Sequence, residues 1–296
     1  MNLFAFGLGY SALNFIREYR RRFERVAGTV TSPEKVQALE GEGVEPYLFD
    51  GSHADSEIAS ALAAPDALLV SIPPDESGDP TLRHLADAIA AAPRLSWIGY
   101  HSTVGVYGDR GGGWVDETTA TAPVSERSRE RVAAENAWRE LGARTGKPVH
   151  VFRLAGIYGP GRNALAQLAS GAARRVIKPG QVFNRIHVDD IAAVLMASIE
   201  RPTAGAVYNL ADDEPAPPQD VIAFAARLAG VEPPPEIGLE EARLGPMAAS
   251  FYAECKRVSN HRIKRELGVS LRHPTYREGL RALHEAGEGP RSDQAA

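Results

Sequence analysis

The stretch FAFGLGYSA, residues 4–12, decides the fold of this chain. It places a G-x-G-x-x-A pattern between an apolar run typical of a strand (NLFAF, residues 2–6) and a helical run with one apolar face (residues 10–22). The first glycine permits a tight turn, the second lets the backbone approach a pyrophosphate, and the alanine lets the helix pack closely on the strand. The helix N-terminus would then face the anion. A tight turn that binds nothing is the alternative to a dinucleotide site formed by Gly7, Leu8, Gly9, Tyr10, Ser11 and Ala12.

The rest of the chain repeats this alternation of strands and helices. Short apolar runs without polar alternation indicate a parallel sheet that is covered on both faces. With right-handed crossovers, this predicts an α/β fold: a Rossmann-type doubly wound parallel sheet with a smaller C-terminal substrate lobe. Ligands in such folds lie at the carboxyl ends of the strands. Strands are expected within residues 2–6, 25–30, 45–50, 66–74, 94–100 and 150–158.

Gly/Pro punctuation after Tyr158 indicates a change of organisation. We expect a dinucleotide-binding domain at 1–158, extended by parts of 180–210, and a C-terminal lobe mainly at 159–286. Helices are expected in the lobe near 219–230, 260–267 and 275–286. The tail, residues 287–296, has no apolar content to bury and is expected to be disordered.

Composition limits the possible partners. Of the 296 residues 44% are hydrophobic and 24% charged, and the net charge is −5 without a long basic run. Nucleic acid and anionic membranes are therefore not expected as partners, whereas a small-molecule substrate is. Cys255 is the single cysteine, so neither an intramolecular disulfide nor a cysteine-based metal site can form, and no metal is expected. No segment has the features of a signal peptide or membrane span, and we expect a cytoplasmic protein.

The end of the second expected strand favours NADP over NAD. An acidic side chain there would accept the ribose hydroxyls of NAD, but this chain has Thr31 and Ser32, followed by Lys35. These groups suit a 2′-phosphate; alternatively Lys35 is a solvated helix residue. Asp50 could accept a bond from adenine or cap a helix. Further cofactor contacts are expected at the ends of later strands, at Ser71, Ile72, Pro73, Ser102, Gly156 and Ile157.

Several ordered motifs resemble the extended branch of the short-chain dehydrogenase/reductase family, of the NAD-dependent epimerase/dehydratase type. Besides the glycine turn they are STVGVYGD (102–109), RLAGIYGPG (153–161), RIHVDDIA (185–192) and VYNLADDEP (207–215). The segments KRVSNHRIKRELG and YREGL near the end are also similar. The resemblance covers nearly the whole chain and implies an NAD(P)-dependent enzyme.

The resemblance also implies a catalytic set, and this chain departs from it. The family's Ser/Thr matches Thr103, and its Tyr-x-x-x-Lys helix carries a glutamate four residues after the lysine. With Glu135 at that glutamate, Arg131 stands at the lysine position and Arg127 at the tyrosine position. The chain therefore resembles atypical members. Arg131 can keep the charge and bind the nicotinamide ribose, but Arg127 cannot relay a proton near neutral pH.

Other side chains are candidates for the missing proton relay. Tyr107 and Tyr158 follow expected strands, although packed rings explain both, and His101 and His187 could titrate near neutral pH. His187 could instead be a structural hydrogen-bonder near a helix start, with Asp189 or Asp190 as the cap. Arg127, Arg162 and Arg185 could form an anion-binding cluster, although solvated arginines are common. Substrate contacts are expected at Tyr158, Arg162, Arg185 and His187.

Two functions follow from these observations. The first is an atypical NADP-dependent oxidoreductase or epimerase-like enzyme acting on a small anionic or sugar-like substrate. The second is a non-catalytic NADP-binding sensor or scaffold. The resemblance also implies a possible homodimer through the helices near Ala86–Ala92 and Val132–Trp138; burial of these faces within one chain is the alternative.

Overall fold

A seven-stranded parallel sheet forms the centre of the computed structural model, which describes residues 1–39 and 41–290. The sheet order is β11-β7-β5-β4-β1-β2-β3, so the strand order changes direction around β1 and β4. Its strands are β1 (Asn2–Phe6), β2 (Arg25–Val30), β3 (Glu45–Leu48), β4 (Ala67–Val70), β5 (Trp97–Thr103), β7 (Val149–Leu154) and β11 (Val207–Leu210). The predicted doubly wound fold is confirmed.

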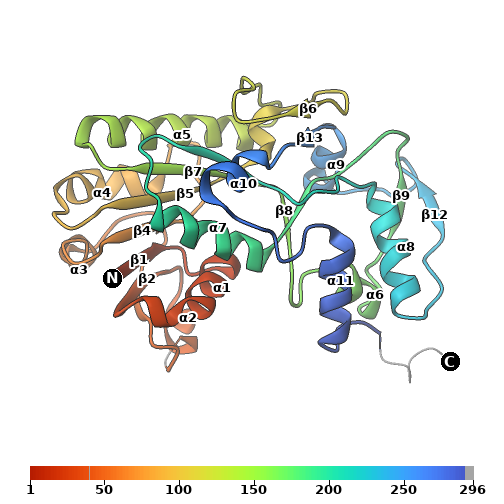
Figure 1. Cartoon of the computed structure of the whole chain (residues 1–296), viewed down its shortest axis with the longest axis horizontal. Coiled ribbons are helices and arrows are strands. Elements are labelled where there is room, and N and C mark those ends of the chain that lie inside the picture. Colours follow the sequence, from red (N-terminus) through yellow and green to blue (C-terminus); the bar gives the residue numbers. More distant parts are fainter. Residues whose placement is uncertain (40, 291–296) are drawn as a thin grey trace.

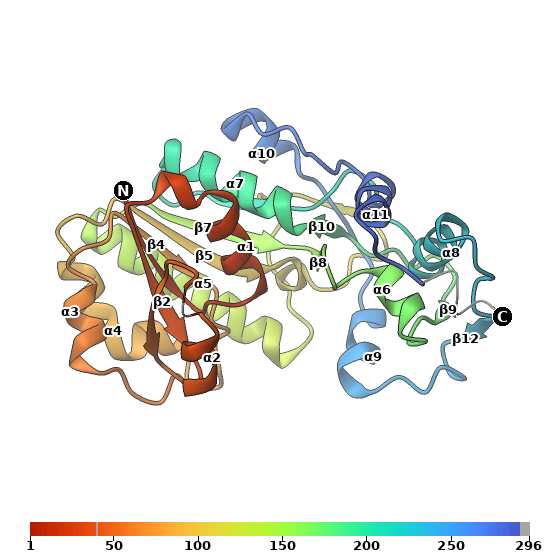
Figure 2. The ribbon, with the colours of Figure 1, turned by 90° about the horizontal axis from the view of Figure 1, so that it is seen from below.

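Helices cover both faces of this sheet (Figures 1 and 2). One face packs against α1 (Tyr10–Glu18), α7 (Val188–Glu200) and α10 (His261–Leu267), and α2 (Pro33–Ala38) lies beside β2 and β3. The other face packs against α3 (Ser56–Ala61), α4 (Pro80–Ala91) and α5 (Glu126–Thr145). Except in the edge strand β3, the strand residues are nearly all buried because apolar side chains meet a helix on either side.

A smaller lobe lies beyond the carboxyl end of the sheet, as Figure 1 shows. Its core joins α6 (Ala164–Ala169), α8 (Pro218–Leu228) and α11 (Tyr276–Glu285). The parallel pair β9 (Arg175–Ile177) and β12 (Glu236–Gly238) forms its edge, and α9 (Pro246–Tyr252) is exposed along its length except for Tyr252.

Two further parallel pairs connect the lobe with the sheet. They are β8 (Gly156–Tyr158) with β10 (Arg185–His187), and β6 (Trp114–Val115) with β13 (Arg257–Val258). A short 3₁₀ helix, η2 (Val104–Tyr107), follows β5 directly, and η1 (Arg20–Arg22) follows α1. The helices expected near 219–230, 260–267 and 275–286 are α8, α10 and α11. The first and third lie in the lobe as predicted, but α10 packs on the sheet beside α7 and β11, so its predicted place in the lobe is wrong.

The expected disordered tail divides into two parts. Residues 287–290 are described, and the Glu288 carboxylate accepts hydrogen bonds from the Gly161 N–H (2.7 Å) and the Asn163 side-chain amide (2.5 Å). The prediction of disorder is therefore wrong for residues 287–290, because the Glu288 carboxylate forms hydrogen bonds with residues of the lobe. Residues 291–296 lie outside the described residues. Within the described ranges, no helix is long and apolar enough to cross a membrane.

The faces considered for a dimer are partly used within one chain. Trp138 is fully buried, and its indole N–H donates to Asp79 Oδ2 at 3.0 Å. Ala133 and Ala137 on the same helix are exposed. A homodimer stays a prediction.

Candidate cofactor and active site

The glycine turn between β1 and α1 is fixed by neighbouring hydroxyl groups. Gly7 has φ +88°, a left-handed conformation that favours glycine, and a Cβ here would lie 2.8 Å from Ser71 Oγ. The Gly7 N–H donates to Thr29 Oγ1 (2.9 Å), and the Ser71 hydroxyl donates to the Gly7 carbonyl (2.6 Å). Strands β2 and β4 therefore hold the turn from both sides.

The space over Gly9 fits a dinucleotide pyrophosphate. Gly9 is the N-cap of α1, no side chain caps this helix end, and a Cβ on Gly9 would meet nothing within 4 Å. The first N–H groups of an α-helix lack partners within the helix, so they suit an anion. Ala12 is buried, which allows the close packing that the sequence predicted. The turn therefore has the shape and donors that the cofactor requires.

The end of β2 presents hydroxyl and amino groups. Lys35 Nζ donates to Thr31 Oγ1 at 2.9 Å, and both residues are exposed. Glu34 is also close, because a hydrogen bond from the Ser32 side chain lowers the pKa of its carboxyl group. Asp50 caps no helix; its carboxylate accepts from the N–H (2.8 Å) and hydroxyl (2.6 Å) of Ser52 in the turn after β3. NADP selection by Thr31, Ser32 and Lys35 stays a prediction.

The other expected cofactor residues have different surroundings. Ile72 is half-buried and Pro73 is exposed after β4, while Gly156 is exposed and Ile157 half-buried on β8. Ser102 is the exception: it is buried, and its hydroxyl donates to Glu135 Oε1 at 2.5 Å. The side chain of Ser102 is therefore committed to the core, and a contact of Ser102 with the cofactor stays a prediction.

Thr103 and Arg131 both form hydrogen bonds at the carboxyl end of β5. Thr103 is half-buried at the end of β5, and its Oγ1 accepts from the Gly105 N–H at 3.1 Å. A hydroxyl that accepts one bond keeps its own proton for donation. Arg131 Nη1 donates to the His101 carbonyl (2.6 Å) and lies 3.2 Å from the Tyr100 hydroxyl. The guanidinium group at the family's lysine position is thus anchored two residues before Thr103.

Arg127 has no such anchor. It is exposed on the first turn of α5, and no hydrogen bond or ion pair of Arg127 occurs within the residues that the structure describes. The neighbouring Ser128 is buried and within 2.9 Å of the Ser125 hydroxyl, which caps α5. A Cβ on Gly105 would lie 2.8 Å from Ser128 Oγ and 3.4 Å from Thr103 Oγ1, so both hydroxyls adjoin Gly105.

Tyr107 belongs to a buried polar network, which corrects its assignment as a catalytic candidate. Its ring is fully buried, and its hydroxyl donates to Asn209 Oδ1 (2.7 Å) and accepts from Arg153 Nη1 (3.0 Å). Arg153 also donates to both carboxylate oxygens of Glu135, at 3.1 and 2.7 Å. Burial raises the pKa of Tyr107. The network fixes α5 against β5, β7 and β11.

The two histidines do not titrate near neutral pH, contrary to the sequence expectation. Burial lowers the pKa of His101 to about 3 and that of His187 to about 4. His187 is the N-cap of α7, and its Nδ1 accepts from the Asp189 N–H at 3.2 Å, which confirms a structural role and makes His187 itself the cap.

Asp189 brings two histidines and an arginine together at the start of α7. Its Oδ2 lies 3.5 Å from His187 Nδ1 and 3.7 Å from His273 Nε2. Arg272 Nη1 is 3.6 Å from the same oxygen, and the Asp189 N–H already occupies His187 Nδ1. We therefore assign no metal to this group.

The expected substrate residues come together only in part: the rings of Tyr158 and His187 lie 5.0 Å apart on the paired strands β8 and β10, and Arg185 is on the same β10. Tyr158 is buried, with its hydroxyl 3.4 Å from the Thr275 carbonyl, and burial raises its pKa, so it is no free acid. Arg162 is exposed and stacks over the Tyr10 ring at 5.9 Å, beside the glycine turn. Arg185 is half-buried on β10 in the lobe. Arg127, Arg162 and Arg185 have no partner in common within the described ranges, and an anion-binding cluster of the three stays a prediction.

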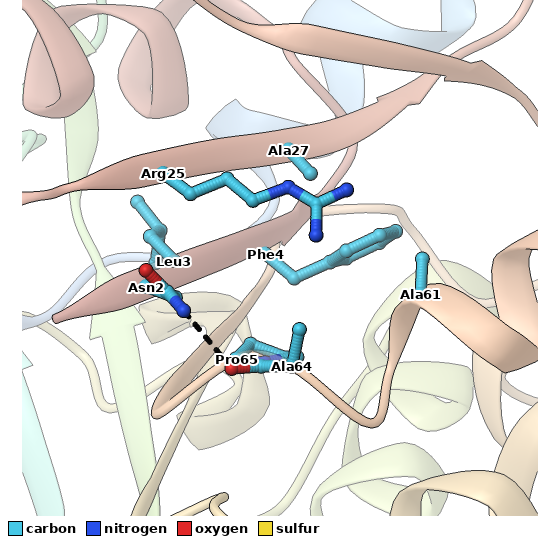
Figure 3. A pocket seen from close by; sticks show the side chains of 8 residues that line it. All are labelled: Asn2, Leu3, Phe4, Arg25, Ala27, Ala61, Ala64 and Pro65. Atoms are coloured by element: carbon cyan, nitrogen blue, oxygen red, sulfur yellow. Dashed lines mark hydrogen bonds between the residues drawn. The ribbon is translucent and has the colours of Figure 1, made fainter.

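A small hollow at the amino-terminal edge of the sheet is unrelated to this site. Asn2, Leu3, Phe4, Arg25 and Ala27 line it together with residues at and after the end of α3, and its volume is 10 Å³ (Figure 3). That is about the minimum for one water molecule. A larger cleft of 460 Å³ lies in the lobe, between the loop at 239–244 and α9.

Comparison with known proteins shows what this chain is similar to. The model of the NAD dependent epimerase/dehydratase family matches residues 82–211, from α4 through β11. That part of the chain resembles this family. A solved structure of a functionally unknown conserved protein from Silicibacter pomeroyi DSS is 50% identical, with a TM-score of 0.87, covering 97% of this chain and 99% of that one. The chain is also 29% identical to Protein YeeZ of Escherichia coli (strain K12), over 90% of its length and 94% of that relative.

Other similarities are more distant, and at 17% identity the likeness to a solved structure concerns the fold alone. dTDP-glucose 4,6-dehydratase from Bacillus anthracis str. Ames, in complex with NAD, is 17% identical with a TM-score of 0.78, covering 97% of each chain. A 3-diazoavenalumate denitrifying reductase from Streptomyces sp is 29% identical over 140 residues, 44% of this chain and 45% of that protein.

Some residues of the site were not anticipated. Thr29 of β2, which holds Gly7, was not anticipated, whereas Ser71, directly after β4, was expected as a cofactor contact; the sheet order brings both to the turn. Arg153 could have been found from the sequence, because it is the one permanent charge in the buried strand VHVFRL. A buried arginine is expected to pair with a buried acidic side chain.

Proposed function

We propose that the chain is an NADP-dependent oxidoreductase or epimerase-like enzyme with an atypical proton relay. The observation that carries this proposal is the convergence of Thr103 and Arg131 at the carboxyl end of β5. In the sheet β5 is separated from the glycine turn of β1 only by β4. Hydroxyl, cation and dinucleotide cradle therefore lie at one edge of the sheet, where ligands bind in such folds.

The cofactor would be held by the chain's own groups in three places. The first N–H groups of α1 suit the pyrophosphate, while Thr31, Ser32 and Lys35 suit a 2′-phosphate. Arg131 suits the nicotinamide ribose, because its Nη1 is fixed to β5 while Nε and Nη2 have no partner within the described part of the chain. NADPH, when bound, supplies a hydride.

The side chains would polarise the substrate oxygen without the help of a catalytic tyrosine. The Thr103 hydroxyl can donate to a substrate oxygen that gains negative charge, and the Arg131 cation stabilises that charge. Tyr107, Tyr158, His101 and His187 are buried and do not titrate near neutral pH. We infer that the proton comes from water or from the substrate. A missing side-chain acid costs about 10²–10⁴-fold in rate, so slow turnover is expected. The reductase among the relatives favours reduction.

Substrate panels with two threonine variants test this proposal. Purified protein is assayed for NADPH oxidation with carbonyl compounds, small carboxylated acceptors and nucleotide sugars. Turnover is expected with at least one class; Thr103→Val should abolish it, Thr103→Ser should retain much of it, and both should bind NADPH normally. Circular dichroism spectra and Tm of both variants are measured alongside and should stay close to those of the wild type, which shows that the variants are folded.

A non-catalytic sensor remains the competing function, and the exposed, unanchored Arg127 at the tyrosine position favours it. Saturable NADPH binding with no turnover across the whole panel would support the sensor and contradict the enzyme. Loss of turnover in Thr103→Val with unchanged NADPH affinity would support the enzyme.

A further inference from the structure

Arg185 of β10 is held by only one end of its guanidinium group. Nη1 donates to the carbonyls of Phe183 (3.0 Å) and Ala216 (3.2 Å). Nε and Nη2 have no hydrogen-bond partner within residues 1–39 and 41–290. Neither atom is fully buried, so both are still accessible to solvent. The Nε–Nη2 edge is the fork that matches two oxygens of a carboxylate or phosphate.

The charge of Arg185 is not neutralised by the chain. No carboxylate of the described residues forms an ion pair with it; the acid that acts most strongly on it is Asp212. Asp212 is 2% exposed, its Oδ2 has no hydrogen-bond partner, and burial raises its pKa to about 8, with Arg185 opposing the rise. At neutral pH Asp212 is therefore largely uncharged. A partly buried cation without a counter-ion is costly, and an external anion would remove that cost.

The surroundings of Arg185 resemble a ligand site. Burial raises the pKa values of Tyr158, Tyr252 and Tyr276, and the Arg185 charge opposes the rise in each case, so the guanidinium charge acts on all three hydroxyl groups. Tyr252 also lines the 460 Å³ cleft beside α9, although Arg185 itself does not. The volume of this cleft lies within the range of about 300–1,000 Å³ that is typical of small-molecule sites.

Arg185 also lies close to the candidate active site. It pairs with Gly156 of β8, an exposed residue two positions after Leu154, and Leu154 is the β7 partner of Thr103. The β8–β10 pair thus leads from the reacting edge of the sheet into the lobe. An anion on Arg185 would belong to a molecule that reaches toward Thr103.

We propose that Arg185 binds a carboxylate or phosphate group of the substrate edge-on, through Nε and Nη2, which have no partner among the described residues. This proposal rests on the proposed function, since it assigns the anion to the molecule that is turned over. It makes the substrate an anion of modest size, anchored in the lobe and not at the exposed Arg127 or Arg162.

The test locates anion binding on the intact protein. Protein labelled with ¹⁵N-arginine is titrated with potassium phosphate and with sodium acetate, and the Arg185 Nε–H resonance is assigned by its loss in Arg185→Lys. A saturable shift of that resonance is expected with phosphate or acetate, whichever the site prefers, and none with sodium chloride at equal ionic strength. Calorimetric titration should show at least tenfold weaker binding in Arg185→Lys, which keeps the charge but loses the fork. Arg227→Lys, at an exposed arginine of α8, should bind as the wild type does.

The outcomes separate the two proposals. A shift equal to that with chloride, or unchanged calorimetric affinity in Arg185→Lys, overturns the Arg185 assignment. NADPH titrations of the same samples judge the proposed function independently. NADPH binding without an anion shift contradicts only the Arg185 site, whereas an anion shift without NADPH binding contradicts the proposed function and with it the identity of the anion as substrate.

Discussion

Glu135 of α5 and Arg153 of β7 form a buried ion pair behind the candidate active site, with Arg153 Nη2 2.7 Å from Glu135 Oε2. Their side chains are 4% and 7% exposed. Ser102 and Tyr107 complete the hydrogen bonding of this pair. Because Ser102 directly precedes Thr103, the pair sets the position of α5, and so of Arg131, relative to the end of β5.

Removal of the Glu135 charge should strongly destabilise the fold. Glu135→Gln leaves Arg153 buried and without a counter-ion, and we expect the free energy of unfolding to fall by about 3–5 kcal/mol in urea titrations. Glu126→Gln is the matched control on the same helix, because its ion pair with Arg129 is exposed and should contribute less than about 1 kcal/mol. Equal, small effects of the two variants would show that the buried pair does not hold α5.

Asp212 should make stability fall as the pH rises. Its folded pKa of about 8 lies above the ordinary value of 3.8, so between these pH values the folded state binds more protons than the unfolded state. The free energy of unfolding therefore decreases with increasing pH across this window and levels off above it. Asp212→Asn removes this contribution.

The measurement is the difference in unfolding free energy between Asp212→Asn and the wild type at pH 5, 7 and 9. The variant should gain on the wild type as the pH rises from 5 to 8, by at most about 1.4 kcal/mol per pH unit. A pH-independent difference would mean that Asp212 is ionised in the folded protein, and that Arg185 already has its counter-ion.

The two glycines of the turn should respond differently to alanine. At Gly9, φ is −97° and a Cβ meets nothing, so Gly9→Ala should leave Tm nearly unchanged yet weaken NADPH binding at least tenfold, by filling the space for the pyrophosphate. At Gly7 the positive φ and the Ser71 contact should cost about 1–3 kcal/mol of stability. Thermal unfolding and fluorescence titration with NADPH measure both. Unimpaired NADPH binding by Gly9→Ala would place the cofactor elsewhere.

The fold could be predicted because its signals are local. Apolar runs, the glycine turn and the helix starts each lie within about ten residues, and strand–helix alternation then leaves few topologies. The small parallel pairs β8–β10, β9–β12 and β6–β13 were not predicted, because strands of two or three residues carry almost no periodicity.

The site was predicted less completely because burial decides which side chains can reach a ligand. Thr103 and Arg131 follow from motif spacing, and the structure brings both to the end of β5. Tyr107, Ser102 and His101 share that neighbourhood in sequence, but alternation along a strand and the 3₁₀ turn after it direct their polar atoms into the core. Whether a side chain near a strand end faces ligand or core depends on partners from distant segments, such as Glu135 and Asn209.

A paired titration of the wild-type protein with NADPH and NADH, followed by nucleotide fluorescence, tests the cofactor assignment on which the enzyme proposal depends. Thr31, Ser32 and Lys35 predict saturable binding of one NADPH per chain, at least tenfold weaker binding of NADH, and loss of that preference in Lys35→Ala. Correctly folded protein that binds neither nucleotide, or that prefers NADH and is unaffected by Lys35→Ala, would contradict it.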